Sequence, residues 1–152
     1  MTHDGGLRLH LRRVLAAPSS VVFRALTEPR ELARWWGPEG FTIPSVECDP
    51  RPGGGYRMAM QPPEGDVFHL VGEYLEVTPP VGLSYTFRWE DPDPEDRETV
   101  VRLTLRDIGA ASAELTVIQG DFLTERRRAL HEEGWTQALD KLEGLVSSAA
   151  SP

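Results

Sequence analysis

The segment HEEGWTQALDKL (residues 131–142) decides the fold, because it carries most of the apolar face of the one long helix that the sequence predicts. Thr124 is suited to cap the start of this helix, and apolar residues recur at helical spacing as far as Val146. The helix should therefore run from Thr124 to Val146, about six turns. Its apolar face should consist of Leu130, Gly134, Trp135, Ala138, Leu139, Leu142, Leu145 and Val146. Such a face has to pack against a sheet.

Short alternating segments precede the helix and predict the strands of that sheet. Leu7, Leu9 and Leu11 alternate with polar residues, and the segment Leu83–Trp89 alternates strictly. Further strands are expected over residues 43–49, 55–61, 67–77, 101–105 and 114–119. Because turn-forming residues separate these segments, consecutive strands should pair antiparallel.

Two short helices should lie between the first strand and the rest of the sheet. Pro18 can open a helix that ends at Thr27, and Pro29 can open a second helix that is closed by Gly37. These helices predict a lid at one end of the sheet. The fold class is therefore α+β: a curved antiparallel sheet around a long C-terminal helix, with two short helices after the first strand.

Length and composition limit the class of protein. The chain has 152 residues, enough for one domain, which we place at residues 7–146 with a disordered tail at 147–152. Its 39% hydrophobic and 26% charged residues are typical of soluble globular proteins. The net charge of -8 would repel a phosphate backbone, so nucleic acid is not an expected partner.

Location and cofactors are also restricted by the sequence. No segment has the roughly 20 apolar residues of a membrane span, and the first residues lack a signal-peptide pattern, so we expect a cytoplasmic protein with no membrane partner. The single cysteine, Cys48, fits a reducing compartment. Because the histidines and Cys48 lack the spacing of zinc ligands, we expect no metal and no other cofactor.

Four segments resemble the family named after the C-terminal domain of the activator of heat-shock-protein-90 ATPase. They are APSSVVFRALT (17–27), WWGP (35–38), DPRPGG (49–54) and HEEGW (131–135). That family belongs to the START and Bet v 1-like (SRPBCC) superfamily, and the resemblance implies its helix-grip fold. Many of its single-domain relatives are bacterial, and members of the wider superfamily bind lipids, hormones or polyketides. The resemblance therefore implies a cavity between sheet and helix.

Aromatic rings are the main candidates for lining such a cavity, because they supply a large contact area and a polar edge. His69 and His131 are the candidate polar groups, able to orient a ligand or carry a proton near neutral pH. The full candidate ligand-binding set is Trp35, Trp36, Phe41, Met58, Met60, His69, Tyr85, Phe87, Trp89, His131 and Trp135. The alternative for each is a structural role: the rings and methionines would fill the core, and the histidines would be satisfied internally.

Gly134 calls for an explanation, because a glycine inside a helix is less stable than alanine by roughly 1 kcal/mol. One explanation is close packing of the helix backbone on the sheet. The other is that the missing side chain leaves space for a ligand.

Three functions are compatible with these features. We favour non-catalytic binding of a small, largely apolar molecule. The first alternative is a co-chaperone-like module that stimulates a chaperone ATPase, and the basic run at residues 126–128 could then contact the partner. A second copy of the chain is another possible partner. A cyclase- or hydrolase-like enzyme is less favoured, because Glu73 and Glu76 should face opposite sides of their strand and no Gly-x-Ser-x-Gly motif occurs.

Overall fold

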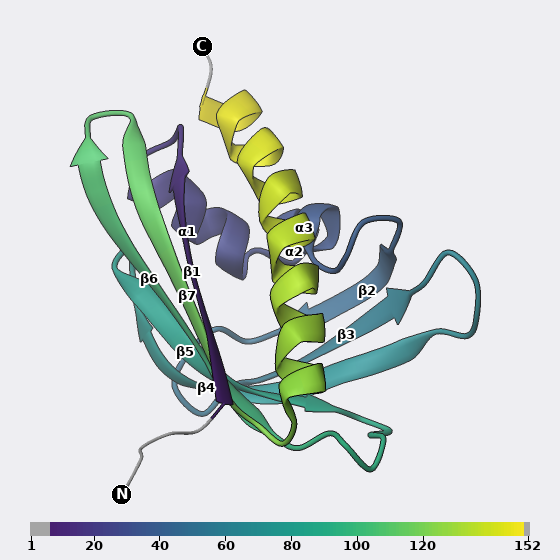
Figure 1. The fold of residues 1–152 in the computed structure, drawn as a ribbon. Coiled ribbons are helices and arrows are strands. Elements are labelled where there is room, and N and C mark those ends of the chain that lie inside the picture. Colours follow the sequence, from purple (N-terminus) through teal and green to yellow (C-terminus); the bar gives the residue numbers. More distant parts are fainter. Residues whose placement is uncertain (1–6, 151–152) are drawn as a thin grey trace, which may run out of the picture.

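The computed structural model describes residues 7–150 and shows a single antiparallel sheet with three helices (Figure 1). The strands are β1 (Leu7–Leu15), β2 (Thr42–Cys48), β3 (Gly55–Gln61), β4 (Phe68–Thr78), β5 (Gly82–Trp89), β6 (Thr99–Gly109) and β7 (Ser112–Phe122). The helices are α1 (Ser19–Thr27), α2 (Pro29–Trp35) and α3 (Glu125–Ala150). The seven-stranded sheet has the order β1-β7-β6-β5-β4-β3-β2, so β7 returns to pair with β1. The predicted α+β class is confirmed.

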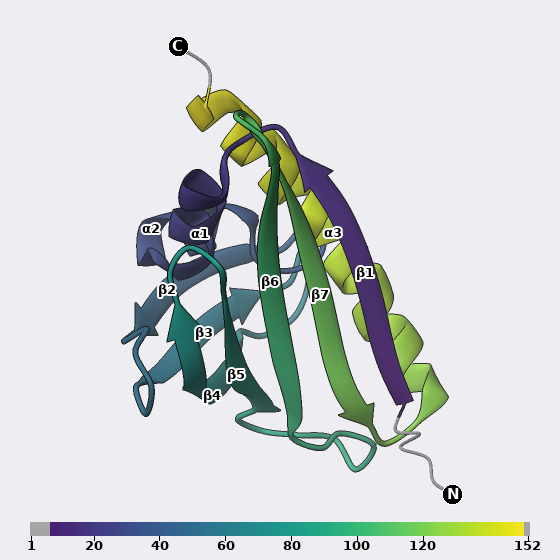
Figure 2. The ribbon, with the colours of Figure 1, turned by 90° about the vertical axis from the view of Figure 1, so that its left-hand side faces the viewer.

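The sheet has one buried face because its strands alternate as the sequence predicted. In β6 and β7 the inward residues Val101, Leu103 and Val117 are fully or almost fully buried, and Leu103 pairs with Val117 across the strands. The polar residues between them face outward. Figures 1 and 2 show α3 lying across this buried face, with α1 and α2 on the same side at one end of the sheet.

The predicted long helix is confirmed, with two corrections. The Thr124 hydroxyl accepts a hydrogen bond of 3.1 Å from the amide of Arg127, which is the predicted N-cap. Leu130 is not on the buried face and is 53% exposed, because at 100° per residue it points about 140° away from Trp135. The helix also continues to Ala150, so residues 147–150 are helical where a disordered tail was predicted. No glycine or proline interrupts the helix between Val146 and that point, and residues 151–152 of the predicted tail lie outside the described range.

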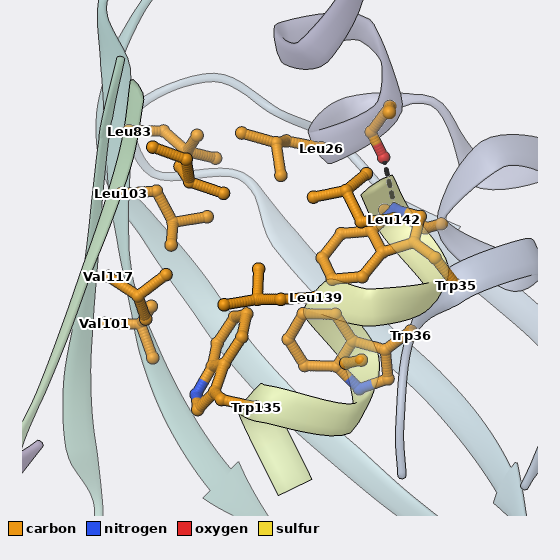
Figure 3. Close-up of a cluster of buried hydrophobic side chains, with 14 of the residues drawn as sticks. Leu26, Trp35, Trp36, Leu83, Val101, Leu103, Val117, Trp135, Leu139 and Leu142 are labelled. Carbon is orange, nitrogen blue, oxygen red and sulfur yellow. Dashed lines mark hydrogen bonds between the residues drawn. The ribbon is translucent and has the colours of Figure 1, made fainter. Parts of the chain in front are cut away.

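Three indole rings join α3 to the short helices (Figure 3). The ring centroids of Trp36 lie 5.4 Å from Trp35 and 5.2 Å from Trp135. Trp35 also donates a hydrogen bond of 2.8 Å to the carbonyl of Ala25 in α1. The cluster therefore ties α1, α2 and α3 together.

Trp135 is linked to the sheet by a buried polar chain. Its indole N–H donates to the Gln119 side-chain oxygen at 2.8 Å, and the Gln119 amide nitrogen donates to the Thr99 hydroxyl at 2.9 Å. Gln119 is fully buried, so these bonds satisfy a group that would otherwise be costly to bury. The contact fixes α3 against β6 and β7.

Within residues 7–150, no helix is both long enough and apolar enough to cross a bilayer.

Replacing Trp135 by alanine should lower the free energy of unfolding by about 3 to 5 kcal/mol, because it removes a large buried ring and leaves the Gln119 oxygen without its donor. Urea unfolding measures this loss. Leu130→Ala, on the exposed side of the same helix, should change stability by less than about 0.5 kcal/mol. Equal effects of the two substitutions would contradict the orientation of α3.

Candidate ligand-binding site

A pocket of about 510 Å³ lies between the first half of α3, the loop that follows α2, and strands β3 to β5. This volume is in the range typical of small-molecule sites. Its walls are mostly apolar, and its polar lining residues come from the loop between β5 and β6, from α3 and, with His69, from β4.

The structure brings most of the predicted residues to this pocket. The loop after α2 supplies Trp36 and Phe41, and the strands and α3 supply the others. The predicted residues that line the pocket are Trp36, Phe41, Met60, His69, Phe87, Trp89, His131 and Trp135. These eight side chains lie at the pocket wall, and contact of each with a ligand stays a prediction.

Trp35, Met58 and Tyr85 lie in the core and not at the pocket. Trp35 is fully buried behind Trp36. Met58 is buried on the same face of β3 as Met60, and it pairs with Leu70 further from the pocket. Tyr85 packs against Tyr56 and Tyr74, with ring centroids 5.4 and 5.9 Å away. Met58 and Tyr85 share a face of the sheet with Met60 and Phe87, but the sheet curves, so only part of that face meets the pocket.

Phe68 lines the pocket but was absent from the predicted set. Its ring centroid lies 6.1 Å from Phe41 and 5.3 Å from Trp89, so it bridges two predicted residues. The sequence could have indicated this position, because Phe68 lies two residues before buried Leu70 on β4 and its side chain therefore points to the same face of the sheet. His69 has the opposite parity, and its Nδ1 lies 3.7 Å from a carboxylate oxygen of Glu90, an exposed residue.

The loop after α2 is held against α3 by two polar side chains. Lys141 donates from Nζ to the carbonyls of Trp36 and Pro38, each at 3.3 Å, and the Glu39 amide donates to the Gln137 side-chain oxygen at 2.9 Å. Burial lowers the pKa of Lys141, while the nearby Glu39 carboxylate opposes this shift. These contacts join residues about 100 positions apart, which no local pattern could predict.

Gly134 faces the pocket and not the sheet. A Cβ atom built at this position would meet only Pro38 Cγ, at 3.6 Å, an ordinary van der Waals distance. Close packing on the sheet is therefore not the reason for this glycine. Gly134 lines the pocket, and the absence of a side chain leaves that part of it open.

Four acidic residues line the pocket, and three of them, Asp91, Asp93 and Glu133, are exposed and lie at its open side, which we call its mouth. Asp91, Asp93 and Asp96 reach the pocket from the loop between β5 and β6, and Glu133 reaches it from α3. Arg127 binds two of them, with distances of 2.9 Å from Nη2 to Asp93 Oδ2 and 3.5 Å from Nε to Asp96 Oδ1. Arg127 Nε is buried without a hydrogen bond of good geometry, the sole such side-chain atom in the part of the chain described.

The predicted basic run is not a free basic surface. Arg127 is engaged by the loop aspartates, and Arg128 forms ion pairs with Glu125 and Glu132 on its own helix. Within residues 7–150, Arg126 is the one member of the run without an ion pair.

His131 is a neutral polar group at the pocket wall. Its ring lies against Phe122, Phe87 and Trp89, with centroid distances of 4.9, 5.4 and 6.0 Å. Burial lowers the pKa of His131 to about 4, with Arg127 lowering it further and Asp96 opposing the shift. No other described residue hydrogen-bonds its imidazole, so one ring nitrogen can accept and the other can donate to a ligand.

Cys48 takes no part in this pocket. Its thiol donates to the Thr27 carbonyl at 3.5 Å, and burial raises its pKa, so it is a poor nucleophile. Among the described residues, no cluster of three His, Cys, Asp or Glu side chains could hold a metal ion. The arrangement can enclose an apolar molecule and offer it a few polar contacts.

Comparison with known proteins identifies the family. A family model described as "Activator of Hsp90 ATPase homolog 1-like protein" matches residues 16–147. The chain belongs to this family. This match confirms the family assignment that was predicted from the four sequence segments. No curated protein sequence matches the chain.

Solved structures of bacterial proteins share the fold of this family member. A protein from Chromobacterium violaceum is 33% identical, with a TM-score of 0.84 over 92% of this chain and 96% of its own. A Nitrosomonas europaea protein is 32% identical, with a TM-score of 0.79 over 94% and 96%. An AHSA1 protein from Silicibacter pomeroyi is 28% identical, with a TM-score of 0.83 over 93% and 99%. The helix-grip fold is thus shared along nearly the whole chain.

The pKa of His131 predicts a loss of stability in acid. In the unfolded chain a histidine titrates near pH 6.5, whereas His131 in the fold titrates at about 4. Between these values the unfolded state binds more protons, so the contribution of His131 is complete above pH 6.5 and is lost as the pH falls toward 4. The loss should be on the order of 2 kcal/mol.

Urea unfolding of the wild type and His131→Gln, at steps from pH 7.5 to pH 4.5, measures this contribution. The wild type should lose more stability than the variant over this range. His10→Gln, at an exposed position of β1, is the control and should follow the wild type. Parallel curves for wild type and His131→Gln would contradict the prediction.

Proposed function

We propose that this chain binds a small, largely apolar molecule non-covalently in the pocket between the sheet and α3. The observation that carries the proposal is a pocket of about 510 Å³ with aromatic walls, formed next to the buried hydrophobic core. Clefts of this size that are lined mainly by apolar and aromatic side chains, with a few polar groups, are typical of small-molecule sites. Burial of an apolar ligand against these walls would supply the affinity.

The polar groups of the pocket fit binding better than catalysis. His131 is neutral and surrounded by rings, which suits it to orient a ligand by one hydrogen bond. The Asp96 carboxylate, a candidate acid or base that also lines the pocket, is engaged by Arg127. Glu73 and Glu76 lie on β4 and do not line the pocket. An enzymatic role is therefore less well supported.

Nile red, an uncharged dye sensitive to its environment, should bind with a stoichiometry of one and quench or shift tryptophan fluorescence. Three of the four tryptophans, Trp36, Trp89 and Trp135, line the pocket and would report on occupancy. Gly134→Leu should weaken binding at least tenfold while the fold is kept, because the new side chain would occupy the pocket beside Pro38. Fluorescence titration measures both effects.

Gly144→Leu is the matched control. Gly144 lies on α3 with no atom within 4 Å of a built Cβ, so the same substitution there leaves the pocket unchanged. Dye affinity should equal that of the wild type. Equal loss of binding in the two variants, or a fluorescence signal that does not saturate, would refute binding in this pocket.

The second candidate is a co-chaperone-like module, which the description of the family favours by naming an ATPase activator. The pairing of Arg127 and Arg128 within the domain leaves little basic surface for such a partner. We therefore expect no appreciable stimulation of the ATPase of a bacterial chaperone of the Hsp90 class. A coupled ATPase assay with excess protein, at low and physiological salt, measures the rate.

Arg126→Glu is the informative variant for this assay, because Arg126 has no ion pair within the described residues and its reversal leaves the loop contacts intact. Reproducible stimulation by the wild type that is lost in Arg126→Glu and retained in Gly134→Leu would replace ligand binding with a surface function. An unchanged ATPase rate in all three proteins would agree with the proposal above.

A further inference from the structure

We infer that the ligand of this pocket carries a positively charged group, such as a protonated amine, on an apolar body. The inference rests on the proposed function and adds the charge of the ligand to it. It is drawn from the combination of an aromatic cavity with the groups at its mouth. Four carboxylates line the pocket, from Asp91, Asp93, Asp96 and Glu133, against one guanidinium, from Arg127.

The single cation of the pocket is already neutralised. Arg127 is bound by Asp93 and Asp96, and its side chain is only 21% exposed. Asp91 and Glu133, in contrast, make no ion pair or hydrogen bond within the described part of the chain. His131 adds no positive charge near neutral pH, because its pKa is lowered to about 4. An anion at the mouth would therefore meet uncompensated like charge, whereas a cation would be attracted.

The loop that carries the aspartates is fixed in place and does not have to be ordered by a ligand. The Asp93 amide donates to Asp96 Oδ2 and the Asp96 amide donates to the Asp93 carbonyl, each at 2.9 Å. Arg127 holds the same two residues from α3, and Figures 1 and 2 show the loop lying beside the start of that helix. The loop backbone that carries Asp91 is therefore preorganised, which lowers the entropy cost of binding.

The pocket walls next to these carboxylates also favour a cation. Trp89 precedes Asp91 by two residues, and its ring packs edge-on against Phe68 and Phe87, with centroid distances of 5.3 and 5.2 Å. The faces of aromatic rings carry negative charge density and attract a cation, most strongly for tryptophan. Apolar contact would supply most of the affinity, and charge would decide which apolar molecule binds.

Three probes with the same naphthalene body separate the apolar and charged contributions. They are 2-(2-naphthyl)ethylamine, 2-(2-naphthyl)ethanol and 2-naphthylacetate, which are cationic, neutral and anionic at pH 7. Isothermal titration calorimetry in 0.15 M salt should give the amine an affinity about tenfold higher than the alcohol, and the acetate a lower affinity than the alcohol. This salt concentration screens distant surface charges.

The double variant Asp91→Asn and Glu133→Gln tests whether the pocket mouth is responsible. Neither side chain makes an ion pair or hydrogen bond within residues 7–150, so stability should be unchanged, and the readout is the ratio of amine to alcohol affinity in each protein. The preference for the amine should fall to about threefold or less. The control is Glu47→Gln with Glu73→Gln, which removes the same charge from exposed positions on β2 and β4 and should keep the preference.

The outcomes distinguish this inference from the function on which it rests. If no probe binds, the proposed ligand-binding function and this inference fail together. If the alcohol binds and the amine binds no more tightly, or the acetate binds best, ligand binding stands and the inference is refuted. It is also refuted if the control variant loses the amine preference as fully as the pocket variant, because net charge alone would then explain it.

Discussion

The hydrogen bond from Trp135 to Gln119 is the contact on which the arrangement of this domain depends. It joins α3 to β7 at 2.8 Å, and Gln119 extends the link to Thr99 on β6. The other side of the Trp135 ring packs against Trp36, which belongs to the loop after α2. Sheet, long helix and lid therefore meet at one indole ring. Because both polar partners are buried, a shift of α3 would break a hydrogen bond that water could not replace at once.

Trp135 also divides α3 into two structurally different parts. After it, Leu139, Leu142 and Val146 are almost fully buried and close the core at one end of the sheet (Figure 3). Before it, the helix presents His131 and Gly134 to the pocket, and these residues do not fill it. The pocket exists because the apolar face of the helix is complete over only part of its length. Core and cavity are thus formed by one helix on one sheet.

The charge pattern of the pocket follows from the same geometry. The acidic loop between β5 and β6 is held at the start of α3 by Arg127, which forms ion pairs with Asp93 and Asp96 only. The remaining carboxylates face a mouth whose inner wall is aromatic. Burial keeps His131 neutral, so it offers a hydrogen bond without adding charge. An apolar interior with a negative opening is the combination that supports a ligand with an apolar body and a cationic end.

The sequence by itself determined the elements, because their signals are local. Proline and glycine positions bounded α2 at Pro29–Trp35, alternation bounded β3 at Gly55–Gln61, and four motifs identified the family. The tertiary structure alone decided which residues of the buried face line the pocket, separating Trp36 from Trp35 and adding Phe68. The tertiary structure also places the acidic loop between β5 and β6 at the open side of the pocket, far along the chain from α2 and α3. The curvature of the sheet and the rotation of α3 decide which residues line the pocket and where the acidic loop lies. Curvature and rotation depend on contacts between residues far apart in the chain, which local sequence signals do not contain.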